Sequence, residues 1–147
     1  MKKRLTIALV AHANRKADMV EWVKHNAELL SHHHLVCTGT TGRLMKEAFD
    51  ELNIPADVTC MNSGPLGGDA EIAALVVRHQ VDLAIFLIDD LNPQPHEADI
   101  QMLLRQCRVH NVPIACNRYS ADLMITSTLW DDDSYKPTEP KYAYFQR

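Results

Sequence analysis

The chain has 147 residues, of which 46% are hydrophobic and 23% are charged, a composition typical of a single globular domain. Its formal net charge is −4 and its basic residues are scattered, which argues against nucleic acid and anionic membranes as main partners. No apolar run is long enough to cross a bilayer, and the apolar stretch after residues 2–4 lacks the cleavage site of a signal peptide, so we expect a cytoplasmic protein.

Apolar runs typical of buried strands alternate with amphipathic segments typical of helices. The first strand is expected at 5–10, and a helix follows over about 17–30, where apolar residues recur at helical spacing. Further strands are expected at 35–38, 56–61, 81–88 and 113–116, and further helices near 44–52, 70–79 and 100–110. This alternation predicts a parallel sheet covered by helices on both faces.

The pattern indicates one α/β domain over residues 1–147, with a mostly parallel five-stranded sheet in the middle of three layers. The alternation of strands and helices ends after Ser127, because the acidic run at 131–133 and the prolines that follow cannot extend a buried element. We expect 128–147 to be a divergent C-terminal tail that packs against its own domain or a neighbouring subunit.

The cysteines, at positions 37, 60, 107 and 116, form no C-x-x-C pair and indicate neither a zinc site nor a disulfide framework. Apolar surroundings predict burial for three of these cysteines.

Three adjacent histidines at 32–34 suit a loop better than a metal site, because neighbouring side chains point in different directions. We therefore expect no bound metal.

Four polar or glycine-bearing clusters follow predicted strands, at 12–16, 38–42, 63–69 and 89–99. In parallel sheets, ligands bind at the carboxyl ends of the strands. One edge of the sheet should therefore collect all four clusters.

The segment 63–69 holds three of the five glycines and ends in Asp69, just before a predicted helix. Backbone N–H groups in so glycine-rich a loop can close on an oxyanion. Asp69 could be a general base whose proton affinity is raised by partial burial, or it could simply cap the helix.

The segment 38–42 places three hydroxyls and two glycines where a strand passes into a helix. The amides and dipole of the helix favour an anion there, although Thr40 or Thr41 could equally serve as an N-cap. The sequence contains no G-x-x-x-x-G-K-[ST] and no G-x-G-x-x-G motif, so a nucleoside triphosphate or a dinucleotide is not favoured.

Four further side chains belong to the same predicted edge. Lys16, four residues after His12, could be a cation for phosphate or a solvated charge. His96 could polarise a carbonyl or shuttle a proton, or it could be exposed in its loop. Asp89 and Asp99 would repel an anion, so we interpret them as residues that orient their neighbours.

Taken in order, the clusters resemble methylglyoxal synthase over about residues 7–127: His12 with Lys16, then 38–42, then 63–69, then 89–99 with its Pro95-His96 pair. The resemblance implies a Rossmann-like fold assembled as a homohexamer. It also implies a cofactor-independent carbon–oxygen lyase acting on a phosphate ester. Such an enzyme converts dihydroxyacetone phosphate into methylglyoxal and inorganic phosphate through an enediolate, and phosphate is also an expected inhibitor.

The resemblance assigns the roles of individual residues. Asp69 would be the catalytic base, His96 would face the carbonyl and hydroxyl oxygens, and His12 would contact the substrate. Asp89 and Asp99 would support them. The expected phosphate ligands are Lys16, Thr38, Gly39, Thr40, Thr41, Ser63 and Gly64, with Arg147 reaching the site of a neighbouring subunit.

Two positions depart from the family pattern. Ala13 stands where an aspartate is common, and Asp90 stands where a proline is common. The loss of a carboxylate next to His12 could alter the tautomer or protonation of that histidine. The main alternative function is a regulatory module of the same fold that senses phosphate or a phosphometabolite without catalysis. A phosphosugar isomerase or another phosphate-eliminating lyase is a third possibility. Asp69 and His96 favour catalysis, because a pure sensor would need neither.

Overall fold

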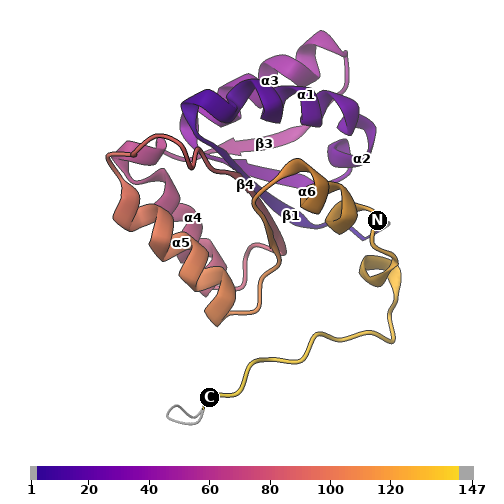
Figure 1. The fold of residues 1–147 in the computed structure, drawn as a ribbon. Helices are drawn as coiled ribbons and strands as arrows, with labels where there is room; N and C mark the ends of the chain where they lie inside the picture. Colours follow the sequence, from indigo (N-terminus) through magenta and orange to yellow (C-terminus); the bar gives the residue numbers. More distant parts are fainter. Residues whose placement is uncertain (1–2, 143–147) are drawn as a thin grey trace.

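The computed structural model describes residues 3–142 (Figure 1). Its five strands form one fully parallel sheet in the order β3-β2-β1-β4-β5. They are β1 Thr6–Ala11, β2 His34–Cys37, β3 Asp57–Cys60, β4 Leu83–Leu87 and β5 Ile114–Ala115. The predicted α/β fold with a five-stranded sheet is therefore confirmed.

Helices cover both faces of the sheet and make it the middle of three layers (Figure 1). On one face lie α1 Lys16–His25, α2 Ala27–Ser31, α3 Gly39–Glu51 and α6 Arg118–Ile125, and on the other lie α4 Gly68–Val77 and α5 Glu97–Val109. Short 3-10 turns are η1 Ala13–Arg15, η2 Gly64–Leu66 and η3 Thr128–Asp131. Within the described residues, no helix is long and apolar enough to span a membrane.

Side-chain alternation along β1 divides the core between these two layers. Ile7 and Leu9 point into the cluster that packs α1, α3 and α6, whereas Ala8 and Val10 point into the cluster that packs α4 and α5. Both faces are buried, which explains why the strand is an unbroken apolar run. Because β1 and β4 are central neighbours, the segments that follow them start side by side.

Two predicted helices differ from those in the structure, and a third helix was not predicted. The helix expected over 17–30 is two helices, because helical structure is interrupted at Asn26. The side-chain amide of Asn26 donates to the carbonyl of Trp22 at 2.9 Å. The helix expected near 44–52 begins earlier, because residues 39–42 form the first turn of α3. The helix α6 was not predicted, although Asn117 caps it by accepting the amide of Ser120 at 2.8 Å.

The expected burial of three cysteines is also wrong. Cys37 and Cys107 are buried, but Cys60 and Cys116 are exposed, because these two lie on or next to an edge strand.

The tail contacts its own domain in several places. Trp130 packs against the core, the Asn111 amide donates to the carbonyl of Thr138 at 3.0 Å, and the Tyr142 hydroxyl donates to that of Val109 at 3.1 Å.

The turn that leads into α4 depends on two glycines. Gly67 has a φ of 103°, in the left-handed region that favours glycine. A Cβ on Gly68 would lie 2.0 Å from the carbonyl oxygen of Asn62. That oxygen accepts the amide of Gly39, and the amide of Asn62 donates to Glu71, so the loop cannot shift freely. The contact fixes the start of α4, where Asp69 lies.

We expect Gly68→Ala to lower the free energy of unfolding by roughly 1–3 kcal/mol, because the atom it meets belongs to an anchored backbone. It should also weaken binding of inorganic phosphate, since the loop at 62–64 must move. Urea denaturation and phosphate titration measure the two effects.

Gly67→Ala is the matched control, because an added Cβ there meets nothing within 4 Å. It should cost stability through its positive φ alone and keep wild-type phosphate affinity. Wild-type stability in Gly68→Ala would contradict the close contact.

Candidate active site

Residues from all four predicted clusters line one cavity of about 160 Å³ at the carboxyl edge of the sheet. The cavity is thus built by the segments that follow β1, β2, β3 and β4. Its lining consists of Val10, Ala11, His12, Ala13, Lys16, Thr38, Thr40, Ser63, Gly64, Pro65, Asp69, Gln94 and His96.

Asp69 is the most unusual group in this cavity. Its side chain is fully buried, and neither carboxylate oxygen has a hydrogen-bond partner among the described residues. Burial raises the pKa of Asp69, and Asp99 adds to that rise, while His96 and Lys16 oppose it. Buried carboxylates are normally hydrogen-bonded, so Asp69 is poised to accept a proton.

His96 lies next to Asp69 at the N-terminal cap of α5. Its Nε2 atom is 3.7 Å from Asp69 Oδ2, and its Nδ1 is buried without a partner in the described structure. Gly64 leaves room for the pair, since a Cβ there would lie 2.8 Å from His96 Nε2 and 3.1 Å from Asp69 Oδ1. A small ligand in the cavity can therefore meet the carboxylate and the imidazole together.

His12 directly follows β1 and is also buried. Its Nδ1 accepts the backbone N–H of Asp89 at 2.9 Å, so the neutral ring carries its proton on Nε2. That Nε2 is buried and has no partner within residues 3–142. Burial lowers the pKa of His12, helped by His96 and Lys16. His12 is thus a neutral N–H donor available to a molecule in the cavity.

Lys16 supplies a positive charge at the start of α1. Its Nζ donates to the carbonyl of Ala11 at 2.7 Å, which holds the ammonium at the end of β1. Burial lowers the pKa of Lys16 and the charge of Asp69 opposes that change. The ammonium leaves two further N–H groups to an anionic ligand.

The segment 38–42 brings the N-terminus of α3 to the cavity. Thr38 caps the helix, and Gly42 makes the first intrahelical bond to its carbonyl, so the amides of Thr40 and Thr41 belong to the open first turn. Thr38 and Thr40 line the cavity. Gly39 and Thr41 are not among the residues that line it: the Gly39 amide donates to the carbonyl of Asn62, and the buried Thr41 hydroxyl lies 3.5 Å from the Ala11 carbonyl.

The predicted supporting residues occupy different places. Asp89 holds the ring of His12 through its backbone, and its carboxylate accepts hydrogen bonds from Asn92 and Asn14, which lower its pKa. Asp99 is half-buried on α5 and acts on Asp69 through its charge. Arg147 lies outside the described residues.

Sequence reasoning missed several residues of this region. Pro65 and Gln94 line the cavity, and Ala13, noted only as a departure from the family, lines it as well. Gln94 stands between two prolines in the loop after β4, where a polar side chain could have been suspected. The bond from Asn14 to Asp89 joins residues 75 apart and has no signal in the sequence.

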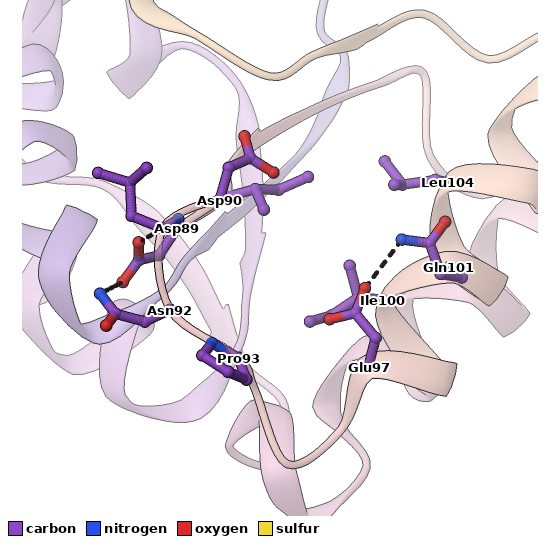
Figure 2. A pocket seen from close by; sticks show the side chains of 10 residues that line it. Asp89, Asp90, Asn92, Pro93, Glu97, Ile100, Gln101 and Leu104 are labelled. Atoms are coloured by element: carbon purple, nitrogen blue, oxygen red, sulfur yellow. Dashed lines mark hydrogen bonds between the residues drawn. The ribbon is translucent and has the colours of Figure 1, made fainter.

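A second cavity, of about 330 Å³, lies between the loop after β4 and the start of α5 (Figure 2). The acidic residues Asp89, Asp90 and Glu97 contribute to its lining, together with apolar residues such as Leu104. In Figure 2, Glu97 accepts the amide of Gln101 across one turn of α5. Its lining carries negative charge and none of the predicted phosphate ligands, so a phosphate is not expected there.

Comparison with known proteins places the chain in one family. Residues 18–116 match the family model described as MGS-like domain. A methylglyoxal synthase of Treponema socranskii is 69% identical over 100% of this chain and 93% of that protein. One from Pseudoalteromonas atlantica is 48% identical over 93% and 98% of the two chains.

A solved structure agrees with the sequence matches. The crystal structure of methylglyoxal synthase from Elizabethkingia anophelis superimposes with a TM-score of 0.83 at 39% identity, covering 98% of this chain and 91% of that chain. These likenesses extend over the whole fold and exceed what a shared architecture alone would give. The chain belongs to the methylglyoxal synthase family.

Proposed function

We propose that this protein is a lyase that converts dihydroxyacetone phosphate into methylglyoxal and inorganic phosphate through an enediolate. The observation that carries the proposal is the fully buried Asp69 carboxylate, which has no hydrogen-bond donor in the described structure and lies 3.7 Å from His96. Membership of the chain in the methylglyoxal synthase family supports the same activity.

The phosphate end of the substrate fits the side of the cavity formed by Thr38, Thr40, Ser63 and Gly64, near Lys16. The open amides of α3 and the hydroxyls would donate to phosphate oxygens, and the ammonium would balance their charge. These groups would fix both the position and the direction of the phosphate.

Asp69 would remove a proton from the hydroxymethyl carbon next to the carbonyl. The C–H bond breaks, the proton goes to a carboxylate oxygen, and the electron pair forms the enediolate. Burial favours this step, because a raised pKa makes the carboxylate a stronger base. A positioned base typically accelerates such a transfer by roughly 10²- to 10⁴-fold.

The enediolate oxygens would receive hydrogen bonds from the two histidines. His12 offers its Nε2–H as a neutral donor, and His96 lies beside the base. A carboxylate base paired with a neutral histidine is also the division of labour in triosephosphate isomerase. Donors that are already oriented stabilise the developing charge without reorganisation.

The direction of the phosphate decides between elimination and isomerisation. When its C–O bond stands perpendicular to the enediolate plane, the σ* orbital overlaps the π system and phosphate leaves with the electron pair. The remaining enol then takes up a proton at carbon, loses its hydroxyl proton and becomes methylglyoxal. When the bond lies in the plane, phosphate is retained and an isomerase results. The loops at 38–40 and 63–64 would therefore select the lyase reaction.

We also propose, from the family resemblance, that residues 1–147 form one domain with a divergent tail at 128–147, and that six copies assemble in the cytoplasm. Light scattering of the purified protein measures the assembly. In such a hexamer Arg147 would serve the phosphate site of a neighbouring copy.

The direct test follows methylglyoxal and phosphate together from dihydroxyacetone phosphate. We expect equal release from the wild-type protein and a loss of at least about 100-fold in kcat for Asp69→Asn, because the variant lacks the base. Asp50→Asn, an exposed carboxylate on α3, is the matched control and should keep wild-type rates. Glyceraldehyde 3-phosphate as the product would instead indicate an isomerase, and near-normal turnover in Asp69→Asn would remove Asp69 from its role.

Inorganic phosphate should compete with the substrate, because both need the same donors. We expect phosphate to raise KM without changing kcat, and Thr40→Val to weaken the inhibition about 10-fold by removing one hydroxyl donor to a charged group. Thr59→Val on strand β3 is the control and should be inhibited like the wild type. Absence of inhibition at millimolar phosphate would argue against this binding site.

Asp69 should cost stability at neutral pH. The pKa of Asp69 is raised in the folded state, so burying the ionised carboxylate lowers the free energy of unfolding. This loss of stability is fully present above the folded-state pKa. It disappears as the pH falls through the unfolded-state pKa near 3.8. We therefore expect Asp69→Asn to be more stable than the wild type at pH 7, with the difference shrinking towards pH 4. Urea denaturation at several pH values measures it, and a variant less stable than the wild type at pH 7 would contradict the penalty.

A further inference from the structure

The carboxylate of Asp89 accepts hydrogen bonds from three donors. The backbone N–H of Leu91 reaches Oδ1 at 3.1 Å, and the side-chain amides of Asn92 and Asn14 reach Oδ2 at 3.0 and 2.9 Å. Figure 2 shows the carboxylate turned towards Asn92, on the side of the loop away from α5. The orientation of residue 89 is therefore strongly determined.

Only one of these three donors comes from outside the loop. Leu91 and Asn92 belong to the same turn as Asp89, so their bonds shape that turn but do not place it. Asn14 belongs to η1, in the segment that follows β1. Its bond joins the segment after β1 to the segment after β4.

A second bond joins the same two segments in the opposite sense. The N–H of Asp89 donates to His12 Nδ1 at 2.9 Å, and His12 lies two residues before Asn14. Residue 89 thus gives its backbone donor to residue 12 and accepts from residue 14. Each bond restricts the movement that would break the other.

We propose that Asn14 is a positioning residue that keeps the N–H of Asp89 on His12 Nδ1, so that His12 presents its Nε2–H to the substrate. The proposal rests on the proposed function, in which His12 donates to an enediolate oxygen. Asn14 acts through Asp89 and does not itself line the cavity.

The hydrogen bond to the Asp89 carboxylate needs a donor at position 14. Variants without that donor therefore test a positioning role rather than a packing role. Asn14 is exposed, so its replacement leaves no buried void. Aspartate has nearly the same size and shape as asparagine but is ionised at neutral pH, and would set two carboxylates against each other. Asn14→Asp and Asn14→Ala should both free the loop, the former by repulsion.

The experiment compares these two variants with the wild type and with Asn26→Ala. The control removes a similar amide bond, from Asn26 to the carbonyl of Trp22 at 2.9 Å, far along α1 from the cavity. Three quantities are measured at pH 7: kcat, KM for dihydroxyacetone phosphate, and the rate of hydrogen exchange at the Asp89 amide.

We expect both Asn14 variants to lose roughly 3- to 10-fold in kcat, the scale of one hydrogen bond, with KM within about twofold of the wild type. The Asp89 amide should exchange faster in both and stay protected in Asn26→Ala. Unchanged kcat or unchanged exchange at Asp89 in the Asn14 variants would overturn the proposal.

Hydrogen exchange at the Asp89 amide is measured without substrate. The lyase activity and the positioning role of Asn14 can therefore be refuted independently. A wild-type protein without turnover would refute the proposed function. A wild-type protein that turns over, beside Asn14 variants that match it, would refute the positioning role alone.

Discussion

One buried carboxylate determines how the rest of this site must be built. Asp69 is fully shielded from solvent and receives no hydrogen bond within the described structure, so its charge is stabilised only by nearby groups. Water would lower the proton affinity of the carboxylate, and hydrogen-bond donors would lower it further. The fold buries the carboxylate, while the nearby His96 and Lys16 limit the rise in its pKa. A group in this state is suited to take a proton from carbon.

The parallel sheet provides the enclosure by bringing the ends of four strands to one edge. The turn into α4 is locked by the contact between Gly68 and Asn62, and Gly64 leaves space above Asp69 for His96. On the other side, the segments after β1 and β4 are joined through Asp89, which fixes the tautomer of His12. Rigid groups around a small cavity need little reorganisation as charge moves from carbon to oxygen.

The sequence was sufficient to predict the sheet and the edge that holds the cavity, because buried parallel strands are unbroken apolar runs that end in polar loops. It did not reveal the break at Asn26, where apolar spacing continues through the kink, nor α6, whose short apolar face buries only Ala121 and Ile125. Within the site, the role of Gly39 as a phosphate ligand stays a prediction, and the sequence did not reveal that its amide donates to the carbonyl of Asn62. Contacts between distant loops, such as Asn14 with Asp89, depend on three-dimensional placement alone.

Burial makes Asp69 a stronger base than an ordinary aspartate. The most direct measurement is the titration of its side-chain carboxyl carbon by ¹³C NMR in the ligand-free protein, with Asp69→Asn used to assign the resonance. Burial of the carboxylate predicts a pKa above the ordinary value of 3.8. A pKa at or below that value would contradict it.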